Sequence, residues 1–240
     1  QRKVVVEEFK ETCLNEPYGD SWHHLSELMY HKHPYRWPVI GLLPEHVQNA
    51  TIEDVRAFYK SWYTPRNAVL SVAGDVNPEQ VAALAEKWFG DIPAGELPLR
   101  NLTPEPPQEA PAWREVIANV PLPAIFIAFR TPARMDPDFY PVDLLSDVLA
   151  QGHSSRPYRR LLRERQIFSQ IDAYITANLD PGLLVVEGRP AAGVSNQEAI
   201  DAVWAELELL KNELIETREL QKIQHRFESK VVFSVTSDLN

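Results

Sequence analysis

Acidic residues near the start of the chain have the chemistry and the spacing of a possible metal ligand. Glu7 and Glu8 follow three consecutive valines. Val5 and Phe9 are four residues apart, as on one face of a helix, and Cys13 extends this apolar stripe. Glu8 would lie on the flank of that face, from where a carboxylate can point into a cleft. The spacing alone favours the alternative that Glu7 and Glu8 are solvated charges.

Two histidines and a carboxylate form a second candidate metal site. His24, Glu27 and His31 recur at i, i+3 and i+7, so a helix would place them on one face. Histidine and carboxylate side chains are common zinc ligands. The inverted zincin pattern would need histidine where Leu28 stands, and the forward His-Glu-x-x-His pattern does not occur. We therefore interpret these residues as surface or packing side chains.

The composition limits the classes of function that the chain can have. Its 240 residues are 44% hydrophobic and 24% charged, as in ordinary globular proteins. The net charge of -10 argues against nucleic acid as the main partner. No apolar run approaches the roughly 18 residues that a membrane span needs. The single cysteine, Cys13, excludes an internal disulfide, and its place on the apolar stripe predicts a buried side chain.

The opening stretch, Gln1 to Glu11, begins without a helix cap or an apolar signal segment. Three β-branched residues in a row favour a strand, but the charged residues around them recur at helical spacing. We therefore expect a helix whose first turns lie upstream of Gln1. The end at Asn240 also lacks the signs of a domain end. The chain is accordingly expected to be an interior fragment of a longer protein.

A proline-rich segment divides the chain into two predicted domains. Residues 93–112 contain six prolines and few large apolar side chains, as in a stiff linker. We expect residues 1–92 to be the C-terminal part of a first, metal-bearing domain. Residues 113–240 would form a second, homologous domain that is truncated. The alternative is a long surface loop within one domain.

The predicted elements mix helices and strands. Thr51 and Asn77 cap two helices that flank a buried strand at 67–73, and Asp180-Pro181-Gly182 is the turn of a hairpin. Further strands are expected at 114–120 and 122–129, and helices at 22–30, 51–62, 77–89, 136–152, 154–163, 195–210 and 217–231. The helix after Thr51 is expected to bury an apolar stripe: Ile52, Val55, Tyr59 and Trp62. Together these elements predict an α+β fold, with mostly antiparallel sheets and helices packed on one face.

The stretch Arg2-Lys3-Val4-Val5-Val6-Glu7-Glu8 resembles the segment that supplies the third zinc ligand in the pitrilysin–insulinase family of metallopeptidases, the inverzincins. By position Glu8 matches that ligand, while Gln1 stands where the family often has a further glutamate. In the family an upstream His-x-x-Glu-His helix provides the other two ligands and the general base. The resemblance therefore implies a zinc cofactor with Glu8 as one ligand. It also implies that the fragment contains no catalytic residue and retains no zinc by itself.

Three later passages carry the same resemblance in the same order. The loop from His33 to Gly41 is similar to a His-Pro-Tyr…Pro…Gly loop of the family. Residues 51–90 are similar to its helix, Tyr-x-Pro, strand, Gly-Asp-Val, helix passage, and residues 152–174 to its Ser-Ser-Arg…Leu-Arg-Glu region. Arg163 matches an arginine that binds substrate in some members, but Gln170 stands where its tyrosine partner would be. The alternative for Arg163, which we favour, is a surface arginine in an ion pair.

The resemblance implies part of a zinc-dependent endopeptidase that hydrolyses peptides or small unfolded proteins and is inactive as a fragment. Substrates would enter between two clamshell halves, the second of which lies on the same chain or on a partner subunit. The bacterial periplasm or cell envelope is the expected location, with no membrane span. The alternative is a non-catalytic homologue that acts as a binding or scaffold half of a peptidase-like complex. The two hypotheses differ in whether the upstream stretch carries His-x-x-Glu-His.

Overall fold

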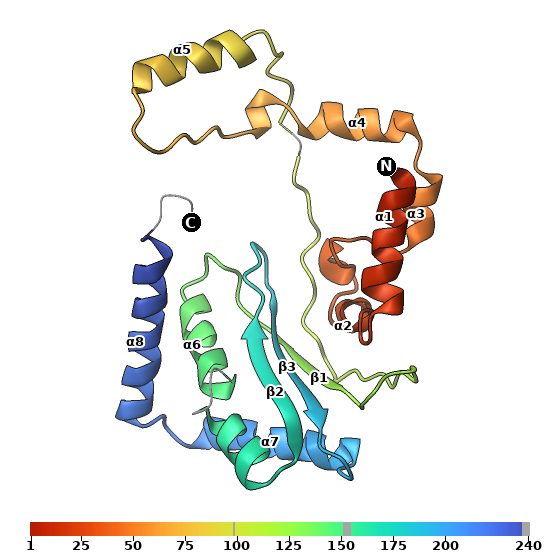
Figure 1. The fold of residues 1–240 in the computed structure, drawn as a ribbon, viewed down its shortest axis with the longest axis vertical. Helices are drawn as coiled ribbons and strands as arrows, with labels where there is room; N and C mark the ends of the chain where they lie inside the picture. Colours follow the sequence, from red (N-terminus) through yellow and green to blue (C-terminus); the bar gives the residue numbers. More distant parts are fainter. Residues whose placement is uncertain (98, 151–154, 237–240) are drawn as a thin grey trace.

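Helices surround a three-stranded antiparallel sheet in the computed structural model of the chain, which describes residues 1–97, 99–150 and 155–236 (Figure 1). This architecture confirms the predicted α+β class. The predicted helix boundary at 152–154, the start of the 152–174 passage and the end at Asn240 lie outside the described residues.

The N-terminal part of the chain is helical. It contains α1 (Arg2–Phe9), η1 (Lys10–Asn15), α2 (Ser21–Met29), η2 (Pro34–Arg36), α3 (Pro44–Asn49), α4 (Ile52–Trp62), η3 (Pro65–Asn67) and α5 (Pro78–Phe89). The C-terminal part carries the sheet. It contains β1 (Ile125–Arg130), α6 (Phe139–Ala150), η4 (Tyr158–Glu164), β2 (Phe168–Ile175), β3 (Leu183–Pro190), α7 (Asn196–Asn212) and α8 (Thr217–Ser234).

The sheet has the strand order β1-β3-β2, and both pairings are antiparallel. The hairpin predicted around Asp180-Pro181-Gly182 is confirmed, because β2 and β3 pair on either side of this turn. One face of the sheet packs against α6, η4 and α7. The buried core on this face consists of Ile125, Leu149, Leu161, Ile167, Phe168, Ile171, Ala173, Leu184, Val186, Ala199, Ala202 and Val203. Helices of the C-terminal part therefore cover one face of the sheet.

The opposite face of the sheet is covered by α2, which comes from the N-terminal part of the chain. Leu25 and Met29 are four residues apart and so lie on one side of α2. Together with Tyr30 they form a cluster with Leu183 and Val185 of β3. Because Val185 is fully buried in this cluster, α2 completes the core of a sheet whose strands come much later in the sequence.

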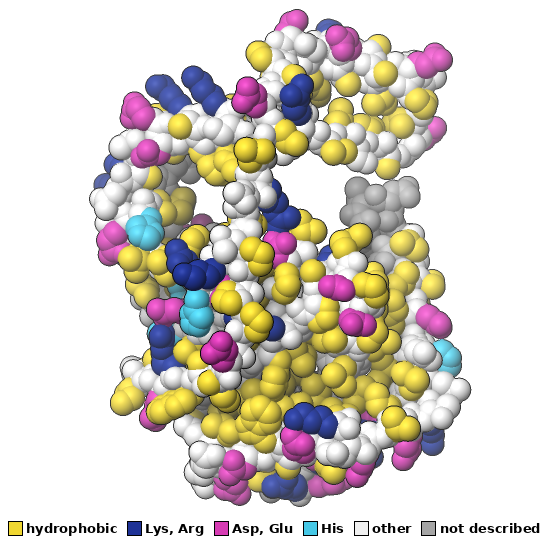
Figure 2. All heavy atoms as spheres, turned by 180° about the vertical axis from the view of Figure 1, so that it is seen from behind, with side chains coloured by type: hydrophobic (Ala, Val, Ile, Leu, Met, Phe, Trp, Pro, Cys, Tyr) yellow, Lys and Arg dark blue, Asp and Glu magenta, His cyan; other side chains and the backbone are white. Residues whose placement is uncertain are grey.

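Residues 51–92 form an arm that extends from the body of the protein, with hydrophobic side chains at its surface (Figures 1 and 2). The two predicted helices are confirmed as α4 and α5, with Thr51 and Asn77 as their N-caps. The predicted burial of the α4 stripe is wrong, since Ile52 and Tyr59 are 57% and 60% exposed. Every residue of α4 is exposed, so this helix buries no stripe against the described residues.

Two predicted strands, at 67–73 and 114–120, are wrong. Both stretches lack strand structure, and Val69 and Ile117 are 96% and 97% exposed. A strand needs a neighbour whose backbone groups complete its hydrogen bonds, and no described strand pairs with either stretch. The strand predicted at 122–129 is confirmed in part, because β1 begins at Ile125 and ends at Arg130.

The proline-rich segment has no regular secondary structure. Its described residues, and those that flank it between Gly90 and Ala124, form neither helix nor strand. The division into two domains at residues 93–112 stays a prediction. In the part of the chain that the structure describes, every helix is too short or too polar to cross a membrane.

Candidate functional site

Buried apolar residues on one side of α1 anchor it to the protein. Val6, Phe9 and Cys13 are buried and recur at i, i+3 and i+7, which is the spacing of one helix face. The prediction that Val5 belongs to this stripe is wrong, because Val5 is 38% exposed. The predicted burial of Cys13 is confirmed. The Phe9 ring packs edge-on against the His23 ring, with 5.6 Å between their centroids.

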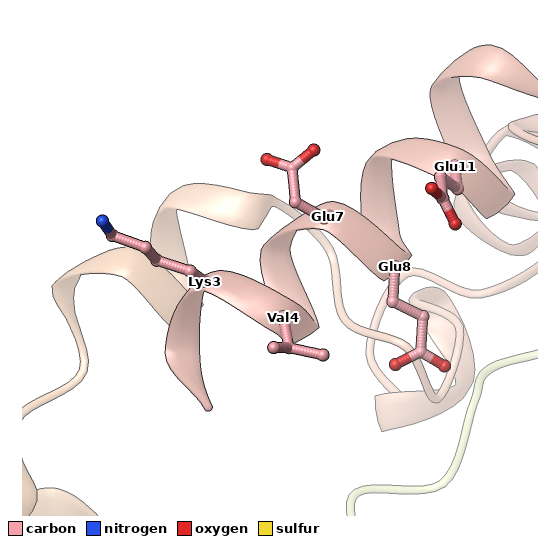
Figure 3. A pocket seen from close by; sticks show the side chains of 5 residues that line it. All are labelled: Lys3, Val4, Glu7, Glu8 and Glu11. Atoms are coloured by element: carbon pink, nitrogen blue, oxygen red, sulfur yellow. The ribbon is translucent and has the colours of Figure 1, made fainter.

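Three exposed glutamates line an open pocket beside α1 and η1. Glu7 and Glu8 lie on α1 and Glu11 lies on η1, and with Lys3 and Val4 they surround a volume of about 520 Å³ (Figure 3). The Glu7 and Glu8 side chains point in different directions from the helix in Figure 3. Glu7 pairs with Lys10 at 2.7 Å, whereas no hydrogen bond or ion pair joins the Glu8 carboxylate to another described residue. Glu8 therefore offers a free anionic oxygen on a fixed helix.

The helix that carries Glu8 continues into the π-helical turn η1. The Thr12 hydroxyl donates to the Glu8 backbone carbonyl at the junction of the two. Single π-helical turns occur often at functional sites, because they shift the register of the side chains on a helix. Gly19 lies against the backbone of this turn: a Cβ at position 19 would overlap the Thr12 carbonyl oxygen and approach Cys13 Cα within 3.0 Å.

Replacing Gly19 with alanine is expected to lower the free energy of unfolding by about 1–3 kcal/mol, as overpacking commonly does. The new methyl group has only backbone atoms to displace, so the π-helical turn or the Gly19 loop must move. Urea unfolding followed by circular dichroism measures the change. Asn15→Ala, at the exposed end of the same turn, is the control and should stay within about 0.5 kcal/mol of the parent. If Gly19→Ala and Asn15→Ala changed the free energy of unfolding equally, the close approach of Gly19 to the backbone of η1 would be contradicted.

The second candidate metal site, which contains His24 and Glu27, is arranged around the guanidinium of Arg114. Arg114 Nη1 lies 2.7 Å from Glu27 Oε2 and 3.1 Å from His24 Nδ1, and His24 Nε2 lies 3.1 Å from Asp20 Oδ2. The hydrogen bond and the charge of Arg114 hold the pKa of the Glu27 carboxyl below its ordinary value. A guanidinium in contact with both side chains disfavours a metal ion at this position. The interpretation of His24 and Glu27 as surface side chains agrees with these contacts.

Zinc binding requires more than Glu8. A catalytic zinc site has three protein ligands and an open position for water. Among the residues that the structure describes, no group of three or more histidine, cysteine, aspartate or glutamate side chains could hold a metal ion. The carboxylate of Glu8 is a suitable oxygen ligand for zinc, but these residues alone do not form a zinc site.

The candidate substrate-binding residue Arg163 lies on η4. Its side chain is exposed, and no ion pair joins it to another described residue, so the expected ion pair is not observed. Gln170, at the position of the tyrosine partner, lies on β2 and is also exposed. By contrast, Leu161 on the same π-helical turn is fully buried. This passage therefore contributes to the core through Leu161, and Arg163 is free to contact a partner or solvent.

Comparison with known proteins identifies the family. The profile described as "Peptidase M16 inactive domain" matches residues 49–227, which is more than half of the chain. The chain belongs to the peptidase M16 family. This is the family of pitrilysin and insulinase, so the resemblance found in the sequence is confirmed. Glu8 lies outside the residues that the M16 profile matches.

Relatives of this M16 chain carry the name of zinc proteases. Zinc protease PqqE of Helicobacter pylori is 30% identical over 236 residues, which cover 93% of this chain and 51% of that protein. The uncharacterized zinc protease YmxG of Bacillus subtilis is 24% identical over 239 residues, covering 99% of this chain and 56% of that protein. The M16 chain thus spans about half the length of the curated relatives it matches.

Solved structures share the M16 fold. A protease from Helicobacter pylori superposes with a TM-score of 0.86 at 27% identity, covering 98% of this chain and 58% of that chain. The first half of the periplasmic protease PqqL from Escherichia coli superposes with a TM-score of 0.69 at 18% identity, covering 98% of this chain and 50% of that one. At that lower identity the likeness concerns the fold alone.

Proposed function

We propose that this M16 chain is part of a zinc-dependent endopeptidase in which Glu8 supplies one of the zinc ligands. The observation that carries the proposal is the free carboxylate of Glu8 on the anchored helix α1, at the position that matches the family ligand. The other two ligands and the general base would come from a His-x-x-Glu-His helix outside these residues. The relatives named as zinc proteases support this assignment.

Within such an enzyme the residues of this chain would hold the metal ion and fix the direction of its ligand. When bound, zinc supplies Lewis-acid chemistry to peptide hydrolysis. Glu8 would contribute an anionic oxygen ligand, and the buried side chains of Val6 and Phe9 would fix the direction of that oxygen. The substrates would be peptides or small unfolded proteins held between this half and a second half. The family resemblance places the proposed enzyme in the bacterial periplasm or cell envelope.

Removal of zinc tests the proposal. The protein expressed from the complete reading frame is expected to bind one zinc ion per chain, because catalytic sites of this kind use a single metal. A chelator should abolish cleavage of a fluorogenic peptide, and added zinc should restore it. The 240 residues alone serve as the control and should retain no zinc when measured by plasma mass spectrometry. Stoichiometric zinc in this shorter chain would contradict a site shared with upstream residues.

A second candidate function is that of a non-catalytic half that binds or positions a peptidase partner. The M16 profile that matches residues 49–227 is that of the inactive domain, and this match favours the second candidate. Sequencing the reading frame upstream of Gln1 separates the two functions. Presence of His-x-x-Glu-His supports the endopeptidase, and a stretch that lacks both histidines supports the binding half.

A further inference from the structure

Three consecutive backbone amides converge on one carboxylate where the N-terminal part of the chain meets the linker. His31 N donates to Glu105 Oε1 at 2.8 Å. Lys32 N and His33 N both donate to Glu105 Oε2 at 2.7 Å. Successive backbone N–H groups that point at one anion form a nest, which is a recurrent anion-binding arrangement in proteins. Both oxygens of Glu105 are therefore bound by main-chain donors.

A cation completes the surroundings of this carboxylate. Arg130 Nη2 lies 3.5 Å from Glu105 Oε1 and donates to the Met29 carbonyl at 2.6 Å, while Arg130 Nη1 donates to the Pro106 carbonyl. Only 7% of the Glu105 side chain is exposed. Burial alone would raise the pKa of Glu105, but the three amides and Arg130 outweigh it and lower the pKa. A carboxylate with so little exposed surface needs such partners, because a charge removed from water is costly unless it is paired and hydrogen-bonded.

Three separate parts of the fold meet at Glu105. The amides belong to the loop that follows α2, Glu105 belongs to the proline-rich segment, and Arg130 is the last residue of β1. Contacts nearby join the same parts: His33 Nε2 lies 3.3 Å from Asp180 Oδ2, and Arg100 pairs with the same aspartate. A single carboxylate thus connects the end of α2, the linker and the sheet.

We propose that the amides of residues 31–33 and the Arg130 guanidinium form a carboxylate-binding site, whose ligand is the side chain of Glu105. Binding of Glu105 fastens the linker across α2 and β1 and so holds the N-terminal helices against the sheet. The site suits a carboxylate because it presents main-chain donors to both oxygens of one group. This site involves neither zinc nor peptide cleavage.

The linker itself provides a direct test of this site. Trypsin cleavage after Arg100, five residues before Glu105, reports how firmly the linker is held. In the complete protein, Glu105→Ala is expected to speed this cleavage about tenfold or more, since a lost charged hydrogen-bond partner shifts a local opening equilibrium by that factor or more. Glu109→Ala is the matched control, because Glu109 is an exposed carboxylate of the same linker. It should leave the rate within about twofold of the parent.

Chemical rescue separates a carboxylate site from a general loss of stability. Acetate or formate should slow the cleavage of Glu105→Ala in a saturable manner, while sodium chloride at the same ionic strength should not. Neither salt should have this effect on Glu109→Ala. Equal cleavage rates for the two alanine variants, or equal effects of acetate and chloride on Glu105→Ala, would overturn the proposal.

A milder variant keeps the test decisive if Glu105→Ala does not fold. Glu105→Asp retains the charge but withdraws the carboxylate by one methylene. Trypsin is therefore expected to cleave Glu105→Asp clearly faster than Glu109→Ala. Native-like circular dichroism together with unchanged cleavage of Glu105→Asp would count against the site. Folding of Glu105→Ala only in the presence of acetate would support it.

Discussion

Glu8→Gln in the protein from the complete reading frame is expected to remove the bound zinc and to lower kcat/KM for peptide cleavage by roughly 100-fold or more. The amide is neutral and binds zinc weakly, and a zinc ion contributes several kcal/mol of transition-state stabilisation, of which each 1.36 kcal/mol is a factor of ten. Because no hydrogen bond or ion pair joins the Glu8 carboxylate to another described residue, the unfolding free energy of the zinc-free protein should not change. Metal content, steady-state kinetics and thermal unfolding measure the three quantities.

Two neighbouring glutamates provide matched controls for this experiment. Glu7→Gln and Glu11→Gln each remove a carboxylate that lines the same pocket as Glu8, and in Figure 3 Glu7 points away from Glu8. Each should alter kcat/KM by about twofold or less, as surface substitutions commonly do. If Glu8→Gln keeps its zinc and its activity, Glu8 is no ligand. If all three variants lose zinc equally, the effect arises from the charge of the helix and not from one ligand.

Leu161→Ala is expected to lower the free energy of unfolding by about 2–5 kcal/mol, because it leaves a cavity in the core beneath the sheet. Leu161 is fully buried among residues of β2, β3 and α7. Arg163→Ala, two residues later on the same π-helical turn, should change the unfolding free energy by about 0.5 kcal/mol or less, as at other exposed positions. Urea unfolding of both variants, followed by tryptophan fluorescence, measures the difference.

An exposed leucine controls for the loss of side-chain volume. Leu214 is 96% exposed, so Leu214→Ala should match Arg163→Ala and not Leu161→Ala. A loss of several kcal/mol on replacing Arg163 would show that this side chain holds the fold together. Peptide cleavage by Arg163→Ala, measured in the complete protein, then tests the contact with substrate that the family resemblance implies, separately from stability.

Local signals predicted the helices well. Thr51 with Asp54 and Asn77 before Pro78 each mark a helix start, and in both cases the N-cap side chain accepts a backbone hydrogen bond. Such signals are reliable because a cap and the first turn of its helix are adjacent in sequence. The hairpin was predictable for the same reason, since its turn residues lie between its two strands.

Strand formation and burial were less predictable because they depend on distant partners. The stretches at 67–73 and 114–120 have the apolar composition of strands, yet no described strand pairs with them. The face of α4 has the spacing of a buried helix, yet Ile52 is exposed. Composition and spacing indicate that such a segment suits a sheet or a core. Composition and spacing do not identify the segment that pairs with such a strand or packs against such a helix.

The proposed zinc ligand Glu8 and the carboxylate site around Glu105 differ in how far the sequence could indicate them. Glu8 was identified by its position in a family segment, and the structure adds that its carboxylate is free and its helix anchored. The site around Glu105 gave no signal, because its main donors are backbone amides, which every residue except proline possesses. Arg130 and Glu105 are also 25 residues apart, which is outside any local spacing pattern.

The cover that α2 provides for the sheet has a consequence for the order of synthesis. The Tyr30 hydroxyl donates to the carbonyl of Pro181, which the ribosome adds 151 residues later. At about 5–20 residues per second, the interval between the two is on the order of 10–30 s. During that time Leu25 and Met29 have no sheet to cover, although their helix can already form. A nascent chain of this protein therefore exposes the apolar side of this helix until its hairpin has been synthesised.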